Sequence, residues 1–349
     1  MESIASILLD WYGRAGRDLP WRRTRDPYRI WISEVVLQQT RVAQGTDYYL
    51  RFTERFPDVE SLAAASEDEV LRMWQGLGYY SRARNLHAAA RAVVAGHGGR
   101  FPASYEAVRA LPGVGEYTAA AVCSAAFGLP VAAVDGNVLR VVSRLFDVAE
   151  PVDAAAGRRA VTALAQELLD VRRPGVFNQA MMDFGATCCT PARPACAECP
   201  LAERCLARAA DTVTLRPVKR GRATVSDRWF DYLHITCGGR TYLRRRGAGD
   251  IWQGLYEFPL VESDRALDFA GLSSGDAFRV WTGGVWRLTG SVVMPPHRLS
   301  HRTIHAVFHR IELPAPTPAL ASCVAVPQER VGEYAVPRLI ENYFSRTYR

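Results

Sequence analysis

The sequence predicts a multidomain protein in which an all-α N-terminal domain is followed by an α+β C-terminal domain. Two observations predict it. The chain has 349 residues, which is more than a single hydrophobic core usually serves. Its pattern also changes from helical spacing to short β-branched and aromatic runs after a cluster of cysteines. We therefore expect a helical domain over residues 1–210, a linker over 211–227 and an α+β domain over 228–349.

The helical domain is predicted from apolar residues that recur every three to four positions among strong helix formers. This spacing runs through residues 60–78, 85–99 and 154–170. The nearly uncharged segment 117–134 resembles a membrane span in length, but it consists mostly of small residues and is broken by Gly128-Leu129-Pro130. We interpret it as a buried helix followed by a turn.

The C-terminal domain is predicted from four strand-like runs rich in β-branched and aromatic residues, at 229–237, 240–246, 285–294 and 303–313. A last helix is expected over 336–349. The polar, basic and proline-containing residues before the first run predict the linker.

Charge and the N-terminus indicate a soluble, intracellular protein. No basic region precedes the first apolar residues, and Asp10 interrupts them, which is typical of an amphipathic helix rather than a signal peptide. Lys and Arg number 43 against 36 Asp and Glu, a net charge of +7. This excess permits a polyanionic partner such as DNA without requiring one. We expect a cytoplasmic, nucleoid-associated monomer with no membrane partner.

Five of the eight cysteines lie between residues 188 and 205, which in a reducing compartment indicates metal binding rather than disulfides. Four of them have the spacing C-x6-C-x2-C-x5-C. A structural zinc site is the alternative, but zinc ribbons usually have two C-x2-C pairs and this loop has one. A compact loop suits a [4Fe–4S] cluster better. The expected ligands are Cys189, Cys196, Cys199 and Cys205. We interpret Cys188 as a spare thiol, because two neighbouring residues seldom both reach one cluster.

A glycine-containing turn at Leu111-Pro112-Gly113-Val114-Gly115 lies between two helical segments. The helix after it would present unpaired backbone N–H groups, which can bind a phosphate oxygen at Gly113 and Gly115 without reading a base. By itself such a turn is more often a simple connector.

Two acidic residues are candidate catalytic groups. Glu34 lies in a helix whose start is marked by Asp26 as N-cap and Pro27 as first residue. Its apolar neighbours predict partial burial and a raised pKa. Asp135 precedes another helix, where a purely structural N-cap is the plainer interpretation. A protonated carboxylic acid paired with an ionised carboxylate is what cleavage of a glycosidic bond requires.

Together these motifs resemble the MutY family of adenine DNA glycosylases in the helix-hairpin-helix glycosylase superfamily. LPWRRTRDPYRIWISEVVLQQTRV, MWQGLGYYSRARNLH, LPGVGEYTAAAV, VDGNVLRV, FNQAMMDFGA and the cysteine loop follow in the family's order. The resemblance implies a helix-hairpin-helix glycosylase domain that binds double-stranded DNA. It also implies excision of adenine mispaired with 8-oxoguanine or guanine, which begins base excision repair.

The resemblance also implies roles for individual residues. Glu34 would protonate N7 of a flipped-out adenine, and Asp135 would stabilise the oxocarbenium-like sugar. Tyr117 and Asn137 match residues that orient this chemistry. Glycosylases that also cut the strand, such as endonuclease III, carry a lysine where this chain has Tyr117, so we expect a monofunctional enzyme without Schiff-base lyase chemistry.

Further residues match the family's DNA-binding positions. Those of the adenine pocket are Leu19, Trp21, Arg22 and Gln179; ordinary core packing is the alternative for Leu19 and Trp21. Gln39 and Tyr79 match residues that fill or wedge the disrupted base stack, although Tyr79 could simply pack, and Thr40 completes the expected substrate-binding set. Arg193 is placed to meet a phosphate or to be a solvated loop charge.

The C-terminal segment Trp252–Pro259 resembles part of the Nudix-like domain that ends MutY proteins and reads 8-oxoguanine. The glutamates of a true Nudix box are missing, so we expect recognition without hydrolysis. Ser300 and His301 match the recognition tip, but Leu299 replaces its usual phenylalanine. Histidines at 297, 301, 305 and 309 would form a metal face only on a helix, and this segment is strand-like.

Two other functions are compatible with parts of the pattern. A mismatch glycosylase that removes thymine from T·G pairs shares the hairpin and the cluster but is typically shorter. A non-catalytic iron–sulfur DNA-binding or redox protein would not need Glu34. An excision assay separates all three.

Overall fold

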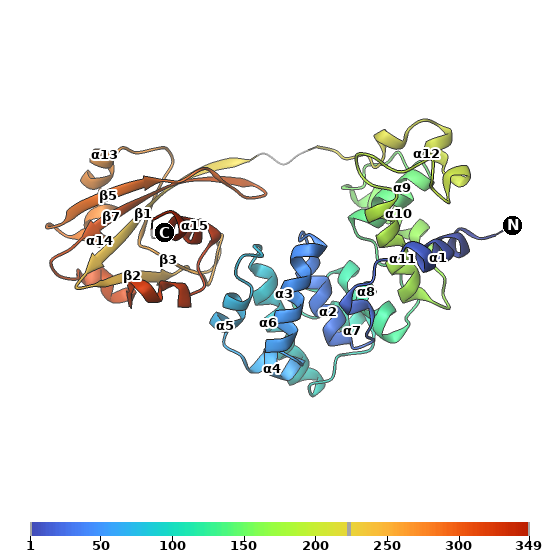
Figure 1. Cartoon of the computed structure of the whole chain (residues 1–349), viewed down its shortest axis with the longest axis horizontal. Helices are drawn as coiled ribbons and strands as arrows, with labels where there is room; N and C mark the ends of the chain where they lie inside the picture. The colour runs from blue at the N-terminus through green and yellow to red at the C-terminus, as the bar shows by residue number, and fades with distance from the viewer. Residues whose placement is uncertain (1, 222–224, 348–349) are drawn as a thin grey trace. The chain divides into compact units, whose positions relative to one another are not determined.

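The computed structural model describes residues 2–221 and 225–347, and its contacts divide them into two compact units (Figure 1). The first consists of Met1–Ala64 and Asn85–Gly221, and the second of Ala65–Arg84 and Arg222–Arg349. Residues 65–84 thus group with the C-terminal unit, whereas the sequence placed them in the N-terminal domain. The expected linker, 211–227, includes residues 222–224, which lie outside the described part of the chain.

The described residues of the first unit form helices and loops without a strand, as the sequence predicted. Its longer elements are α1 (Ile4–Ala15), α2 (Pro27–Leu37), α3 (Val42–Arg55), α4 (Val59–Ala64), most of α6 (Ser81–His97), α7 (Tyr105–Arg109), α8 (Glu116–Phe127), α9 (Gly136–Leu145), α10 (Ala155–Leu168) and α11 (Pro174–Thr187). The short turns η1 (Pro20–Arg22), η2 (Ala202–Arg204) and η3 (Val213–Leu215) and the helix α12 (Leu206–Ala209) complete it.

Local signals explain where these helices begin and end. Asp26 accepts a hydrogen bond from the Tyr28 N–H and caps α2, as expected. Gly128, in the left-handed region with φ 69°, ends α8 and confirms the predicted turn. The helical spacing over 60–78 belongs to two helices: α4 ends at Ala64, and Ser66 caps α5 (Glu67–Met73) by accepting from the Glu69 N–H. None of the described helices is long and apolar enough to cross a membrane.

A hydrophobic core shared by α1, α9, α10 and α11 supports the candidate site. Val142, Phe177 and Phe184 are buried within it, and the cysteines of the loop pack against its edge. Helix α8 packs against both α2 and α11. These contacts fix α2, α8, α9 and α11 as one rigid body, so their side chains can hold a common geometry.

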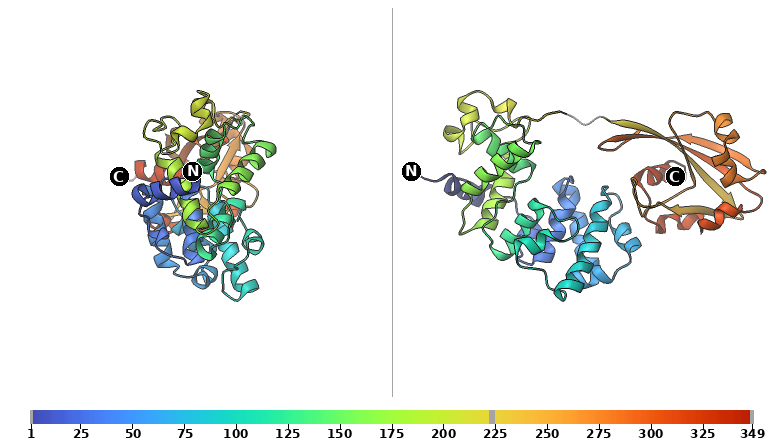
Figure 2. Two further views of the ribbon diagram at one scale, coloured as in Figure 1. Left: turned by 90° about the vertical axis from the view of Figure 1, so that its right-hand side faces the viewer. Right: turned by 180° about the vertical axis from the view of Figure 1, so that it is seen from behind.

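The described strands of the second unit form one mixed sheet. These strands are coloured from yellow to red in Figures 1 and 2. Its strands are β1 (Ser226–Cys237), β2 (Arg240–Arg245), β3 (Tyr256–Glu257), β4 (Leu260–Ser263), β5 (Arg287–Val293), β6 (His297–Arg298), β7 (Arg302–Glu312) and β8 (Val324–Pro327). The main order is β3-β2-β1-β7-β5, in which only β1 and β7 pair in parallel. All four strand-like runs of the sequence are therefore confirmed as strands.

Alternation along β1 places helices on both faces of the sheet. Phe230 and Tyr232 point into a core shared with α15 (Arg338–Thr347). Leu233 and Ile235 point into a second core, which includes residues of α13 (Phe269–Ser274) and α14 (Asp276–Thr282). The short turns η4 (Pro318–Ser322) and η5 (Gln328–Glu333) flank β8.

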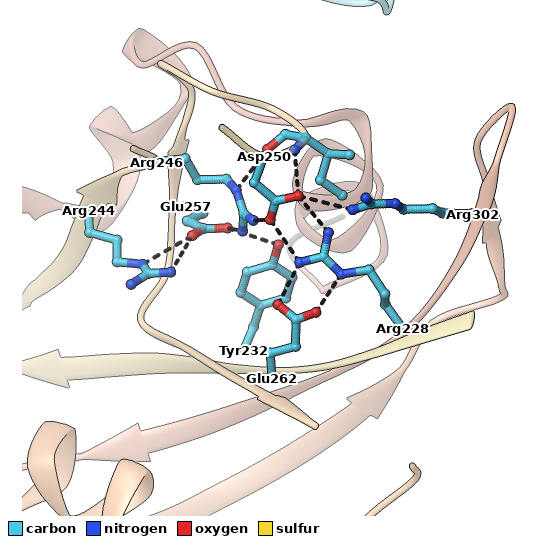
Figure 3. A network of polar contacts seen from close by, with 9 residues as sticks. Arg228, Tyr232, Arg244, Arg246, Asp250, Glu257, Glu262 and Arg302 are labelled. Atoms are coloured by element: carbon cyan, nitrogen blue, oxygen red, sulfur yellow. Dashed lines mark hydrogen bonds and ion pairs between the residues drawn. The ribbon is translucent and has the colours of Figure 1, made fainter. Parts of the chain in front are cut away.

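Two acidic side chains organise arginines at one end of this sheet (Figure 3). Glu257, fully buried, accepts hydrogen bonds from Arg244 and from Arg246, whose Nη1 lies at 2.7 Å. Asp250 accepts two bonds from Arg228, both at 2.7 Å, and one from Arg302 at 3.1 Å. The network ties the segment before β3 to the start of β7.

Candidate active site

A cavity of about 690 Å³ opens in the first unit between η1, the end of α2, α8, the start of α9 and α11. Ten of the residues predicted from the sequence line it: Leu19, Trp21, Arg22, Glu34, Gln39, Thr40, Tyr117, Asp135, Asn137 and Gln179. The fold thus places residues that are up to 160 positions apart around one cavity, because four packed helices each contribute one face to its lining.

Glu34 lies half-buried on α2 and faces the cavity. The Tyr117 hydroxyl donates a hydrogen bond to its Oε2 at 2.5 Å. Burial raises the pKa of Glu34 to about 7; the hydrogen bond from Tyr117 lowers it, the charge of Asp135 raises it and Arg22 lowers it. Glu34 can therefore hold or release a proton near neutral pH, which a general acid requires.

Asp135 is the N-cap of α9. Its Oδ1 accepts from the Val138 N–H and its Oδ2 from the Asn137 side-chain amide, both at 2.7 Å. Burial raises the pKa of Asp135, and these two hydrogen bonds oppose the rise because they favour the carboxylate. The capping role and the catalytic role are compatible, since the cap fixes the carboxylate where it lines the cavity.

Asn137 is itself held from behind by Arg140, which the sequence analysis did not single out. Arg140 donates to the Asn137 Oδ1 at 2.9 Å and to the main-chain carbonyls of Gly185 and Cys189 at 2.7 and 2.9 Å. Arg140 is 8% exposed. Buried charges of this kind stay in place only with several hydrogen-bond acceptors.

Asp183 of α11, also missed by the sequence analysis, holds Arg17 and Arg22, which line the cavity. Its fully buried carboxylate accepts two bonds from Arg22, both at 2.7 Å, and further bonds from Arg17. One turn earlier on α11, Gln179 accepts from the Tyr12 hydroxyl at 3.1 Å. The four-residue spacing of Gln179 and Asp183 on one helix was the available signal.

Trp21 both packs in the core and lines the cavity. Its ring is 5% exposed and packs edge-on against Tyr49 at 5.3 Å, yet the residue also lines the cavity. Met182 is an additional lining residue, and its sulfur lies 3.3 Å from the Tyr117 hydroxyl. Gln39, at the turn after α2, has φ 57°, a left-handed conformation that residues other than glycine seldom adopt.

The hairpin has the geometry that a phosphate site needs. Gly113 has φ 72°, and a Cβ there would lie 2.5 Å from the Cβ of Asn85, so glycine is required. Gly115 is the N-cap of α8, and a Cβ there would meet nothing within 4 Å. The space beside Gly115 is thus free at the start of α8, where the first backbone N–H groups have no partner within the helix.

The cysteine loop surrounds a second pocket. It is lined by Cys189, Cys196, Cys199 and Cys205 and also by Cys188. Buried Arg144 donates to the Cys189 sulfur at 3.4 Å and to the carbonyls of Thr190 and Pro191. In the described part of the chain no three His, Cys, Asp or Glu side chains are close enough to hold one metal ion. The lining is instead five thiols around a space, four of which have the predicted spacing, and this fits a larger cluster.

Arg193 lies exposed in the same loop, and its carbonyl accepts from the Thr190 hydroxyl at 2.6 Å. An exposed arginine fits both interpretations of this residue, a contact with a DNA phosphate and a solvated charge.

The remaining predicted residues belong to the second unit. Tyr79 is 48% exposed, has φ 47°, and its hydroxyl lies 2.5 Å from the Ser300 Oγ. His301 is exposed beside it in sequence, and Leu299 packs half-buried against the core of the sheet. Two of the other histidines pair with acids: His305 with Asp227 at 2.8 Å and His309 with Asp231 at 3.0 Å.

Comparisons with known proteins agree with this geometry. The model of the HhH-GPD superfamily base excision DNA repair protein matches residues 32–169, and the NUDIX domain model matches residues 231–346. Adenine DNA glycosylase of Homo sapiens is 47% identical over 58% of this chain and 38% of that protein. The adenine DNA glycosylase of Buchnera aphidicola subsp. Acyrthosiphon pisum (strain APS) is 32% identical over 73% of each chain. The match thus spans well under half the length of the mammalian relatives.

Two solved structures share the fold. A thermostable thymine-DNA glycosylase is 33% identical, with a TM-score of 0.54, and the match covers 59% of this chain and 95% of that one. A non-covalent endonuclease III–DNA complex is 25% identical, with a TM-score of 0.52, and the match covers 59% of this chain and 94% of that one.

Proposed function

The chain belongs to the adenine DNA glycosylase family, and on that premise we propose that it hydrolyses the N-glycosidic bond of adenine mispaired with 8-oxoguanine or guanine in double-stranded DNA. One observation carries the proposal: Glu34 and Asp135 face one cavity, where burial raises the pKa of both while two hydrogen bonds favour the carboxylate of Asp135. Glycosidic hydrolysis needs one carboxyl group that donates a proton and one that stays ionised.

The proposed reaction starts when adenine is flipped out of the duplex into the cavity, because its reacting atoms are inaccessible while stacked. Protonated Glu34 donates its proton to N7, which makes the base a neutral leaving group. The C1′–N9 bond then breaks, and the ionised Asp135 stabilises the positive charge that develops on the sugar. Glu34, now a carboxylate, takes a proton from the water that attacks the sugar.

The surrounding side chains support each step. Tyr117 orients Glu34 through its hydroxyl, and Asn137 orients Asp135 through its amide. Leu19, Trp21, Arg22 and Gln179 would enclose the base, since they line the same cavity. Because Tyr117 has no nucleophilic amine, we infer that water is the nucleophile and that the enzyme does not cut the strand.

We further propose that the four cysteines hold a [4Fe–4S] cluster. When bound, the cluster would supply a rigid cross-link between the end of α11 and η2, rather than electrons, because hydrolysis transfers none. Cys189, Cys196, Cys199 and Cys205 would be its ligands. The loop between them carries Arg193, which we assign to a backbone phosphate.

In the second unit we assign the reading of 8-oxoguanine to Ser300 and His301, and the wedge in the base stack to Tyr79. The exposure of Tyr79 and its left-handed backbone support this role, because such strain persists mainly at functional positions. Gln39 and Thr40 would fill the space that the flipped base leaves.

The test is an excision assay of the full chain on duplexes with A·8-oxoguanine, A·G and T·G pairs. We expect excision of adenine from the first two, a strand break only after alkali, and none with Glu34→Gln, which should still bind the duplex. Excision of thymine would identify a T·G enzyme instead, and nicking without alkali would contradict the role of Tyr117. If the wild-type chain binds but excises no base, the protein is a non-catalytic DNA-binding protein.

A further inference from the structure

Four arginines line the cavity of the first unit, and they differ in their partners. Arg17 and Arg22 both bind the carboxylate of Asp183. The side chains of Arg41 and Arg158 form no ion pair with any of the described residues. The cavity therefore has two positive charges that no acid in the described part of the chain neutralises.

Arg41 and Arg158 lie where the cavity opens to solvent. Both are exposed although they line it, whereas the lining residue Trp21 is 5% exposed. Arg41 precedes α3, which packs against α2, and Arg158 lies on α10, which packs against α9 (Figure 1). Because α2 carries Glu34 and Asp135 caps α9, one arginine reaches the mouth from the side of each carboxyl group.

Neither arginine stabilises the helix on which it lies. Arg41 is the N-cap of α3, where a side chain that accepts a hydrogen bond is preferred, and a guanidinium only donates. Arg158 is the fourth residue of α10, close to the end where the helix dipole disfavours a cation. A bound anion would offset both unfavourable placements, so a ligand explains these arginines better than helix stability does.

Close packing at Gly157 fixes the backbone from which Arg158 extends. A Cβ on Gly157 would lie 2.3 Å from the carbonyl oxygen of Pro151, so the start of α10 can approach this segment only with glycine there. The first turn of α10 is thus held against the main chain. A backbone that is already ordered lowers the entropic cost when the guanidinium beside it binds a ligand.

The two arginines do not tune the proposed acid. The charges that shift the pKa of Glu34 are those of Asp135 and Arg22, with burial as the largest cause. Removing Arg41 or Arg158 should therefore leave the pH dependence of excision unchanged. This separates a role toward DNA from a role in proton transfer.

A phosphodiester group is the ligand that fits these arginines. A guanidinium binds phosphate through two parallel N–H···O bonds, and each phosphodiester of DNA carries one negative charge. When a nucleotide enters the cavity base first, its two flanking phosphates remain at the mouth. We propose that Arg41 and Arg158 bind these two phosphates, one on each side of the extruded adenosine. The inference rests on the proposed function and extends the adenine pocket to the DNA backbone.

The test is the salt dependence of duplex binding by the full chain, with Glu34→Gln as the background so that no base is removed. The dissociation constant is measured between about 50 and 200 mM salt. On an A·8-oxoguanine duplex, Arg41→Gln and Arg158→Gln should each reduce the slope of log Kd against log salt by about 0.9, and both together by about 1.8. On a fully paired duplex, which extrudes no adenosine, the slopes should not change.

Matched controls come from the same two helices. Arg159, the next residue on α10, and Arg51 on α3 are both exposed and lie outside the cavity. Arg159→Gln and Arg51→Gln should keep the parent slope on both duplexes. Arg158→Lys keeps the charge and should restore the parent slope, which a variant that had lost its fold could not do.

The remaining outcomes contradict the inference. If either single variant keeps the parent slope on the A·8-oxoguanine duplex, that arginine does not bind a flanking phosphate. Equal losses on both duplexes would mean that the arginines contact DNA whether or not a nucleotide is extruded. An equal change in Arg159→Gln would mean that net charge alone is measured. Unchanged slopes beside an active wild type overturn only this inference, whereas a wild type that excises no adenine overturns the proposed function.

Discussion

Arg140 connects Asn137 to the main chain of the first proposed cluster ligand. Its Nη2 donates to the Asn137 Oδ1 at 2.9 Å, and its Nε donates to the Cys189 carbonyl at 2.9 Å. The amide of Asn137 in turn donates to Asp135. A continuous set of hydrogen bonds therefore joins the end of α11 to a candidate catalytic carboxylate.

Arg140→Gln should slow excision while leaving the cavity intact. The shorter neutral side chain cannot reach all three acceptors, so Asn137 loses its fixed orientation and Asp135 loses one of its two donors. We expect the single-turnover rate on A·8-oxoguanine duplexes to fall by about 10- to 100-fold, as for other supporting residues.

The matched control is Arg172→Gln, which removes a guanidinium that is 85% exposed and lies outside the cavity. It should excise at the wild-type rate. Iron content, measured in the same preparations, separates a lost orientation from a lost cluster. An unchanged rate in Arg140→Gln would show that Asn137 does not depend on it.

The sequence singled out Glu34 and Asp135 because each lies in a short segment with a local signal, a helix start for Glu34 and an N-cap position for Asp135, and because both segments resemble motifs of the family. It did not predict Arg140 or Asp183. Both look like solvated charges on their own helices, and their burial depends on α1, η1 and the cysteine loop packing around them. The helical spacing of residues 65–84 was visible in the sequence, whereas their contacts with the second unit depend on the folded chain.

The pH dependence of excision should follow Glu34. The acid must be protonated to donate, and burial raises its pKa to about 7, so the rate should fall as the pH rises through that value. Tyr117→Phe removes a hydrogen bond that favours the carboxylate, so the pKa should rise further. We expect the fall in rate to move to higher pH by about one unit.

The measurement is the single-turnover rate between about pH 5 and about pH 9, at substrate concentrations that saturate the enzyme. Tyr48→Phe serves as control, because it also deletes a phenolic hydroxyl but lies outside the cavity. A shift toward lower pH in Tyr117→Phe would mean that the hydroxyl does not stabilise the ionised Glu34.

Two substitutions at Asp135 should separate its capping role from its catalytic role. Asn can still accept from the Val138 N–H, so Asp135→Asn should fold with nearly wild-type stability yet excise no detectable adenine. Asp135→Ala should lose excision and also about 1 kcal/mol of stability, because the cap is gone. Thermal melting and the excision assay together check both variants. Substantial turnover by Asp135→Asn would argue that its charge is not used.

Glu257 should be the most sensitive acid of the second unit. It is fully buried and accepts from Arg246, whose side chain is 6% exposed. Glu257→Gln leaves Arg246 with Asp250 as its remaining acidic partner and removes the charged acceptor of Arg244, at a cost of about 1.5–3 kcal/mol. Hydrogen exchange of the amides in β1 and β2 measures the opening free energy. Glu262→Gln, whose side chain is 39% exposed in the same network, should cost below about 1 kcal/mol.

Leu299 offers a test of how the second unit contacts DNA. Its N–H donates to the Arg302 carbonyl at 2.7 Å, which closes a tight turn, and Arg302 is anchored on Asp250. A phenylalanine in this turn could stack on a base, and stacking contributes about 1–3 kcal/mol whichever base is present. Leu299→Phe should therefore tighten binding of A·8-oxoguanine and A·G duplexes by similar factors, of about tenfold.

Ser300→Ala should act differently, because a hydroxyl reads the hydrogen-bonding groups of a base rather than its ring face. We expect it to reduce the preference for A·8-oxoguanine over A·G while changing the affinity for A·G little. Equilibrium binding with Glu34→Gln as the background prevents excision during the measurement. Leu288→Phe, at the far end of the β5–β7 pair, controls for added aromatic surface. If Leu299→Phe tightened binding of only the A·8-oxoguanine duplex, this turn would recognise 8-oxoguanine by its shape. Stacking alone would then not account for the effect of the substitution.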